Sequence, residues 1–288
     1  MLAIAGLLVV IVCVFGVYAA TGGNMEIVMK AAPHELATIL GAGIGAFMIS
    51  NSSTVLKASL KDIKLVIKGP HWKAADYKDL LCLMFQLCKL IKTKGIIAAE
   101  AHIEKPEESA IFSQYPHVAH DHFSLGLITD TLRMMTMNFE NPMHVEDHMN
   151  RQLEKHHHEH TKPGDAWQSM ADGLPALGIV AAVLGVIKTM ASINEPPAVL
   201  GGMIGSALVG TFLGVFLAYG IVGPIASRLK QVYEEDNQFY CIIRDVLVAH
   251  LQGSAPQVSV EIGRGNIPTK MQPSFAEVEE ALNGIAPV

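Results

Sequence analysis

Two long apolar segments separated by a short polar turn constrain the fold of this chain more than any other feature. They are Leu174–Ile193 and Ala198–Ile225, and the turn between them is Asn194–Pro197. Each segment has roughly twenty residues or more, enough for a helix to cross about 30 Å of hydrocarbon. A turn this short leaves the two helices antiparallel, so the sequence predicts a transmembrane hairpin.

Two further apolar segments precede the hairpin. Leu2–Ala20 has no basic residues in front of its long apolar run, so we interpret it as a retained membrane helix and not as a cleaved signal peptide. Leu36–Ile49 is short for a membrane span, but Gly41 and Gly45 have the spacing that lets membrane helices approach closely. We therefore expect four transmembrane helices.

The positions of Lys and Arg indicate the orientation, because cytosolic loops carry an excess of positive charge. Several lysines follow the second apolar segment, and Arg228 and Lys230 follow the fourth, whereas the turn 194–197 has none. Both termini and the large loop between the second and third segments are therefore expected in the cytosol. Within that loop, Tyr77–Thr93 places apolar residues at helical spacing.

The expected fold class is therefore an all-α polytopic membrane protein with four transmembrane helices and a helical cytoplasmic domain. We assign membrane helices one and two to residues 1–50, the cytoplasmic helical domain to 51–170, membrane helices three and four to 171–225, and a cytoplasmic helical extension and tail to 226–288.

Composition and motifs exclude several functional classes. A net charge of −6 and the lack of a basic patch interleaved with aromatic residues argue against nucleic-acid binding. The four cysteines have no zinc-binding spacing and are expected to be buried, reduced thiols. We find no nucleophile, acid–base or phosphate-binding motif, so we do not expect this chain to be an enzyme. The cluster His156–His160 has an i,i+4 pair but no further ligands, so we expect a solvated helix end and no metal, although metal binding there stays open.

Two prolines are the most informative individual residues of the hairpin. Pro175 follows Asp172, which can cap a helix, so by itself Pro175 predicts the first turn of the third span. Helical periodicity runs through Pro224, which cannot donate a hydrogen bond to the carbonyl of Gly220 and should kink the fourth span. Both prolines are expected near the same membrane face.

Polar groups are scarce inside the hairpin. The hydroxyl of Thr211, near the middle of the fourth span, either bonds back to its own helix or lines a hydrated path. Neither hairpin span contains an acidic residue deep in its apolar stretch. We therefore expect the ionisable centre of a membrane device of this kind to belong to another chain.

The hairpin segments Asp172–Val186 and Val209–Gly220 resemble the MotA family, the stator subunits of the bacterial flagellar motor. Supporting stretches are Thr21–Gly23, Gly41–Gly45 and Pro273–Phe275, so the resemblance runs nearly from end to end. It implies an inner-membrane subunit, in contact with membrane lipids, that converts proton flow into torque. It also implies a homo-oligomeric ring, five copies around a MotB dimer, whose single membrane helix supplies the proton-accepting aspartate.

The resemblance also implies roles for individual residues. Pro175 and Pro224 match the family's two functional prolines, which couple proton passage to movement of the cytosolic part. Lys92 and Glu100 match the charged pair that engages the rotor protein FliG, although the best-known members have arginine in place of Lys92. The proton is the implied coupling ion, because sodium-driven relatives carry a threonine where this chain has Ala182, and an alanine methyl cannot replace part of an ion's hydration shell.

Three alternatives remain at this point. An ExbB- or TolQ-like energiser of outer-membrane processes usually has three spans, so the short segment Leu36–Ile49 is the discriminating feature. A sodium-driven stator subunit differs in its coupling ion. A membrane-anchored scaffold would have the same spans but no conduction.

Overall fold

The computed structural model describes residues 2–285, and within that range it contains helices and no strand. The chain forms two compact units. The first comprises Met1–Gly69 and His160–Val232, and the second comprises Pro70–Glu159 and Tyr233–Val288. Helices α9 (Pro142–Ala191) and α11 (Gly223–Leu251) contribute residues to both. These units are defined by packing, so they do not test the expected boundaries between membrane and cytoplasmic segments.

Four helices of the described chain are long and apolar enough to cross a membrane. They are Leu2–Ala20, Met25–Ser50, Pro142–Ala191 and Pro197–Leu251. The first is built from α1 (Leu2–Ile11), a π-helical turn η1 (Val12–Gly16) and α2 (Val17–Ala20), and the last from α10 (Pro197–Leu217), the π-helical turn η5 (Ala218–Val222) and α11. The expected fold class is confirmed.

The second span is longer than the sequence predicted. Helix α3 runs from Met25 to Ser50 and passes through Pro33, whereas the predicted span began at Leu36. The side chain of Asn24 accepts hydrogen bonds from the backbone N–H groups of Glu26 and Ile27, so the helix starts there. As a consequence, Glu35 lies within a membrane-spanning helix.

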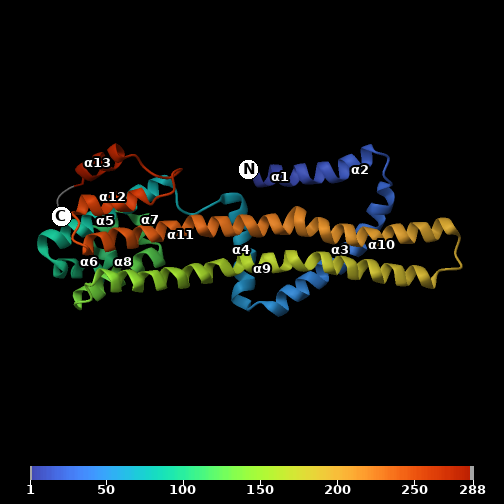
Figure 1. Cartoon of the computed structure of the whole chain (residues 1–288), viewed down its shortest axis with the longest axis horizontal. Coiled ribbons are helices and arrows are strands. Elements are labelled where there is room, and N and C mark those ends of the chain that lie inside the picture. Colours follow the sequence, from blue (N-terminus) through green and yellow to red (C-terminus); the bar gives the residue numbers. More distant parts are fainter. Residues whose placement is uncertain (1, 286–288) are drawn as a thin grey trace. The chain divides into compact units, whose positions relative to one another are not determined.

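The first unit packs α3, the C-terminal part of α9 and α10 closely together around small and aliphatic side chains. Figure 1 shows α9 and α10 running side by side and joined by a short connection. The π-helical turn η1 also touches α10, because the ring of Phe15 contacts Phe212 and Phe216 with centroids 5.8 and 5.2 Å apart. Helix α4 (Ser53–Lys68) follows α3 and contacts α1. The buried core comprises Ala31, Ile39, Ala171, Leu174, Ala181, Val209, Leu213, Ala218 and Val222.

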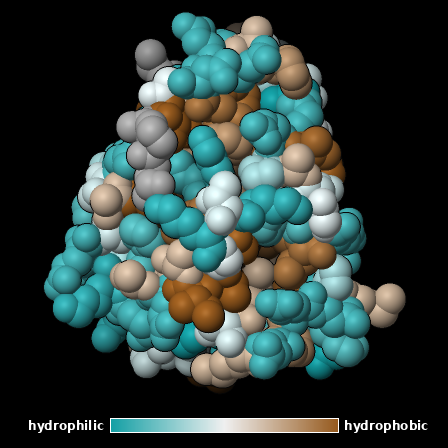
Figure 2. Space-filling model, turned by 90° about the vertical axis from the view of Figure 1, so that its left-hand side faces the viewer, coloured by the Kyte–Doolittle hydropathy of each residue, from teal (hydrophilic) through white to brown (hydrophobic). Residues whose placement is uncertain are grey.

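The second unit has a hydrophobic core built around α5 (Ala74–Lys94). Its other elements are η2 (Ile96–Ala99), α6 (Glu100–Glu104), η3 (Pro106–Glu108), η4 (Phe112–Gln114), α7 (Pro116–Ala119), α8 (His122–Thr136), α12 (Pro256–Gly265), α13 (Phe275–Asn283) and parts of α9 and α11. Trp72 stacks on Phe239 with ring centroids 3.7 Å apart. Figure 2 shows that the outer face of this unit is mostly hydrophilic, which fits contact with water.

The cysteines agree with the sequence prediction only in part. Cys82 and Cys88 are buried in α5, whereas Cys241 is partly buried and Cys13 is exposed on the first span. All four are free thiols. Burial raises the pKa of the Cys88 thiol to about 12 and that of Cys82 to about 11. The prediction of burial is wrong for Cys13, because an apolar membrane helix can expose a thiol to lipid at little cost.

The histidine cluster lies in the interior of α9 and not at a helix end, and it is solvated only in part, since His158–His160 are exposed. His156 stacks on Phe123, with ring centroids 3.5 Å apart, and His157 Nε2 lies 3.4 Å from the carboxylate of Glu234. Both rings are half-buried inside the second unit. Among the described residues no cluster of His, Cys, Asp and Glu side chains is arranged to hold a metal ion.

Candidate functional site

Glycines bring the backbones of α9 and α10 into direct contact. A Cβ atom added to Gly214 would lie 2.7 Å from the carbonyl oxygen of Leu174 and 2.8 Å from the Cα of Gly178. Towards the turn of the hairpin, a Cβ on Gly185 would lie 2.7 Å from the Cβ of Ala207. Small residues are enriched where membrane helices approach this closely. The hairpin is therefore tightly packed along its length, which fixes the positions of the side chains beside it.

An acidic side chain reaches the hairpin at Gly210. A Cβ on Gly210 would lie 2.6 Å from Oε2 of Glu35 and 3.3 Å from the backbone nitrogen of Ala182. Glu35, on α3, is half-buried in the chain, and α3 packs along α10. The structure thus brings together Glu35, Gly210 and two residues that the sequence singled out, since Thr211 follows Gly210 and Ala182 faces it across the hairpin. Thr211 and Ala182 are both half-buried.

Sequence reasoning missed Glu35 because it began the second span at Leu36, after Pro33. A signal was present: Ile27, Val28, Ala31 and Ala32 have helical spacing before the proline, and Asn24 is a good capping residue. An ionisable group inside a membrane span is costly and usually functional. The expectation that the membrane-embedded part has no acidic group of its own therefore holds for the hairpin spans but not for α3.

Pro175 lies in the interior of α9, so the prediction that it starts a helix is wrong. The side chain of Asp172 does not cap a helix start but accepts a hydrogen bond of 2.9 Å from Nε2 of Gln168, one turn earlier. Because proline has no N–H, Pro175 cannot donate to the carbonyl of Ala171. A helix of this length therefore has a weak point directly beside the contact between Leu174 and Gly214.

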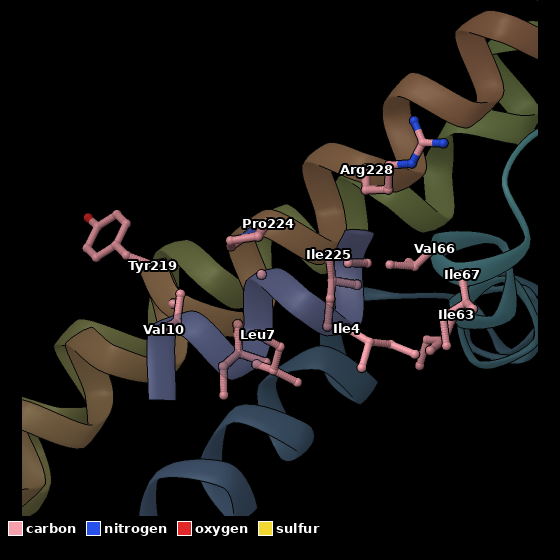
Figure 3. A pocket seen from close by; sticks show the side chains of 14 residues that line it. Ile4, Leu7, Val10, Ile63, Val66, Ile67, Tyr219, Pro224, Ile225 and Arg228 are labelled. Carbon is pink, nitrogen blue, oxygen red and sulfur yellow. The ribbon is translucent and has the colours of Figure 1, made fainter. Parts of the chain in front are cut away.

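Pro224 lies where the fourth span changes its helical geometry. The π-helical turn η5 ends at Val222, and α11 then continues without interruption through Pro224, as the sequence predicted. Kinks in helices are found at prolines and at π-helical turns, and this segment has both. The ring of Pro224 is exposed and lines a groove with residues of α1 and α4 (Figure 3).

The packing register separates the two prolines along the hairpin. Leu174 faces Gly214, and further along the pair Asp165 Oδ1 forms an ion pair of 2.8 Å with Lys230 Nζ. At 1.5 Å per residue, Pro224 lies about 15 Å beyond Gly214 along the helix axis. The two prolines therefore loosen the hairpin at two different levels.

The two charged residues proposed for rotor contact lie in the second unit. Lys92 is in the last turn of α5 and Glu100 is the first residue of α6, and both are exposed. Between them α5 ends at Gly95, whose φ of 82° is readily adopted only by glycine. Both side chains are therefore accessible at the surface of the second unit.

Four spans, a glycine-packed hairpin and intramembrane proline and glutamate residues define a multi-pass α-helical membrane protein. Comparison with known proteins narrows this class. Residues 4–95 match the family "Motility protein A N-terminal", and residues 121–240 match the "MotA/TolQ/ExbB proton channel family".

Similar proteins cover nearly the whole chain. Motility protein A of Salmonella typhimurium is 39% identical over 285 residues, covering 99% of this chain and 96% of that protein. Motility protein A of Escherichia coli is 38% identical with the same coverage, and the chemotaxis protein LafT of Vibrio parahaemolyticus is 34% identical over 96% of each chain. The chain therefore belongs to the motility protein A family, a branch of these proton channels, which confirms that it is not an enzyme.

Solved structures confirm the fold. A chain of the C. jejuni MotAB structure matches with a TM-score of 0.71 at 17% identity, covering 94% of this chain and 98% of that chain. A chain of the flagellar MotAB stator complex from Bacillus subtilis also has a TM-score of 0.71, at 20% identity, and covers 96% of this chain and 100% of that one. With four spans and full-length similarity to motility proteins, the three-span energiser is no longer a competing interpretation.

Proposed function

We propose that this chain is the channel subunit of a flagellar stator, which couples inward proton flow to torque on the rotor. The observation that carries the proposal is the glycine-packed hairpin of α9 and α10, in which Thr211 and Ala182 lie at one level with Glu35. The two weak points at Pro175 and Pro224 both lie further from the turn of the hairpin than this level. Similarity to motility protein A over 99% of the chain supports it. The bacterial inner membrane is the proposed location, with the second unit in the cytoplasm.

The proposed partner in the membrane is a dimer of a MotB-like protein with one membrane helix per subunit. The outer face of α9 exposes aliphatic side chains to which such a helix or further copies of this chain can pack, among them Val183, Leu184 and Ile187, which are 52, 55 and 61% exposed. Hydrophobic surface of this kind on a span must face lipid or protein. We infer a ring of this chain around the partner, with five copies as the proposed number.

In the proposed mechanism the partner supplies the aspartate that takes up the proton. Protonation removes its charge near Thr211, and the change in local electrostatics relaxes the helices at Pro175 and Pro224. The energy is adequate, since one charge that crosses 100 mV releases about 2.3 kcal/mol. No other cofactor enters this scheme.

Glu35 adds a second carboxylate to this scheme. Its Oε2 atom lies against Gly210, beside Thr211, so a negative charge or a proton on Glu35 acts at the same level as the partner's aspartate. We infer that Glu35 attracts protons and water to the path, and that it is not itself sufficient for conduction. The methyl group of Ala182 at this level supports the proton, not sodium, as the coupling ion.

Movement in the membrane is proposed to reach the rotor through the second unit. Lys92 and Glu100 are exposed charges on this unit and are the proposed contacts with the rotor protein FliG. Lysine in place of arginine keeps the charge but loses the planar fork that binds carboxylates in a bidentate manner. Long-range electrostatic steering is therefore the proposed form of this contact.

Pro175→Ala tests the coupling role, with Pro163→Ala as a matched control. Both prolines lie inside α9, and alanine at either position can restore the missing backbone hydrogen bond. We expect Pro175→Ala to reduce swimming in soft agar at normal protein levels, whereas Pro163→Ala swims. Normal swimming of Pro175→Ala at normal expression would support a non-conducting scaffold and contradict the coupling proposal.

A further inference from the structure

The side chain of Trp167 joins three helices of the first unit. Its Nε1–H group donates a hydrogen bond of 3.2 Å to the backbone carbonyl oxygen of Ser59, in the interior of α4. Its ring contacts Phe47 of α3, with ring centroids 5.4 Å apart. Figure 1 shows α4 crossing α9, the helix that carries Trp167. A single side chain therefore ties α9 to both α3 and α4.

This tie is a contact within the protein and not a lipid anchor. Tryptophan is enriched at membrane interfaces, where its N–H group usually meets water or headgroups. Here the N–H group is used within the chain, the indole is half-buried, and Ser59 is fully buried. The Oγ atom of Ser59 makes no hydrogen bond with the described part of the chain. Because the acceptor is a main-chain oxygen, the tie depends on Trp167 and not on the hydroxyl of Ser59.

Helix α3 also packs on the next turns of α9. A Cβ added to Gly43 of α3 would lie 3.5 Å from Cε of Met170 and 3.3 Å from Cδ2 of Leu174. Trp167, Met170 and Leu174 recur at intervals of three and four residues, so they share one face of α9. The stretch of α9 from residue 167 to residue 174 is therefore held by α3 and α4 directly before Pro175.

Beyond Pro175, α9 makes backbone contact with α10. A Cβ added to Gly178 would lie 2.9 Å from the carbonyl oxygen of Gly210. Because Pro175 cannot donate to the carbonyl of Ala171, the helix bends more easily here than at its hydrogen-bonded turns. At 1.5 Å per residue, Trp167 lies about 12 Å from Pro175 along the helix axis. Helix α9 thus has one arm beyond Pro175 that packs on α10, and one arm before Pro175 that Trp167 ties to α3 and α4.

We propose that Trp167 is a positioning residue of the coupling mechanism. Its contacts make the arm of α9 before Pro175 move as one body with α3 and α4 when the helix bends. The bend is then passed on along α9 instead of being lost as slip against the neighbouring helices. This inference rests on the proposed function and adds to it the residue that transmits the bend. Without the tie, protons still pass the level of Thr211, but their passage no longer produces torque.

The test separates proton passage from motility. Trp167→Ala removes the hydrogen bond and the ring contact, whereas Trp167→Phe keeps an aromatic ring beside Phe47 but loses the hydrogen bond. Each variant is produced with the single-span partner and compared with the unmodified complex in proton uptake by lipid vesicles and in swimming at equal protein levels. We expect both variants to take up protons at the unmodified rate, with swimming lost in Trp167→Ala and slowed in Trp167→Phe. A merely structural role would lower uptake and swimming together.

Two controls match these variants. Ser59→Ala removes a hydroxyl but keeps the backbone oxygen that accepts the hydrogen bond, so it should swim normally. Phe15→Ala removes an aromatic contact of the same unit, with Phe212 and Phe216 of α10, that leaves α9 tied, and it should also swim. Loss of swimming in either control to the degree seen in Trp167→Ala would overturn the inference, because the effect would then not belong to the tie.

The outcomes distinguish this inference from the proposed function. No proton uptake by the unmodified complex would overturn both. Uptake by the unmodified complex, together with normal swimming of Trp167→Ala or with equal loss of uptake and swimming in that variant, would overturn the role of Trp167 alone. If Trp167→Ala does not fold, Trp167→Phe decides, and normal swimming of that variant would contradict the inference.

Discussion

The carboxylate of Glu35 lies against the backbone of Gly210, so close that a Cβ on the glycine would be 2.6 Å from Oε2. This relationship joins α3 to the hairpin at the level where Thr211 and Ala182 lie. It gives the membrane part of the chain an acidic group that the hairpin itself does not have. The first prediction concerns this carboxylate.

Glu35→Gln should reduce proton-driven swimming without abolishing it, because glutamine retains the size of the side chain but not its charge or its capacity to titrate. Glu26→Gln is the control, since Glu26 lies in the same helix but is exposed and pairs with Lys30 at 2.5 Å. Swimming speed at equal protein levels is the readout. Equal speeds for both variants and the unmodified chain would show that Glu35 has no part in the path.

Gly214→Ala should destabilise the hairpin more than Gly210→Ala. At Gly214 the new Cβ would meet backbone atoms of Leu174 and Gly178, which cannot move aside, whereas at Gly210 the nearest atom is the end of the flexible Glu35 side chain. Overpacking of this kind costs about 1–3 kcal/mol. Thermal unfolding in detergent measures the difference, and a lower melting temperature for Gly210→Ala than for Gly214→Ala would contradict the packing described.

Asp236→Ala should destabilise the second unit by about 1–3 kcal/mol, because it leaves two backbone donors without their acceptor. Oδ1 of Asp236 accepts hydrogen bonds from the N–H groups of His71, at 2.7 Å, and Trp72, at 3.3 Å. Asp236→Asn keeps one oxygen at this position and should cost less. Chemical denaturation followed by the fluorescence of Trp72 measures the stability of the second unit. Equal stability of Asp236→Ala and Asp236→Asn would rule out the role of Asp236 as a hydrogen-bond acceptor.

Cys82 and Cys88 should resist a water-soluble maleimide in the folded chain at pH 7 to 9. The thiolate is the reactive form, and burial raises the pKa of these thiols to about 11 and about 12, so the thiolate is scarce until the pH approaches those values. Both should react after unfolding in denaturant. Mass spectrometry locates the modified cysteines, and rapid labelling of Cys88 in folded protein would show that α5 is not packed as described.

Lys92→Glu should impair swimming, whereas Lys92→Arg should not, because the proposed rotor contact depends on the sign of the charge. Lys105→Glu is the control, since Lys105 is an exposed lysine of the same unit that pairs with Glu108 at 3.2 Å. Motility at equal protein levels is again the readout. Impairment by Lys105→Glu to the same degree would indicate a general effect of charge and no specific rotor contact.

Much of the fold follows from the sequence because the thickness of the bilayer dictates the length of apolar segments. The hairpin, the four spans and the continuation of the helix through Pro224 were predictable in this way. The start of α3 was not, since a proline inside an apolar pattern predicts either a helix end or a tolerated interior position. The same ambiguity made Pro175 look like a helix start, although it lies in the interior of α9.

The contents of the site were less predictable than the fold. Thr211 and Ala182 were identified from the sequence, but the contact between Glu35 and Gly210 joins residues far apart in the chain, and no local pattern indicates such a pair. The stacking of His156 on Phe123 is of the same kind. Local composition predicted a solvated helix end, whereas long-range packing half-buries His156 and His157 and leaves the rest of the cluster exposed.

The central claim is that this chain forms a conduit wall that conducts only when a partner helix adds its aspartate. Proton uptake by lipid vesicles under an imposed membrane potential tests it most directly, with the chain alone, with its single-span partner, and with a partner whose membrane aspartate is replaced by asparagine. The account predicts uptake only for the complex with the intact aspartate. Uptake by the chain alone at the rate of that complex would contradict it.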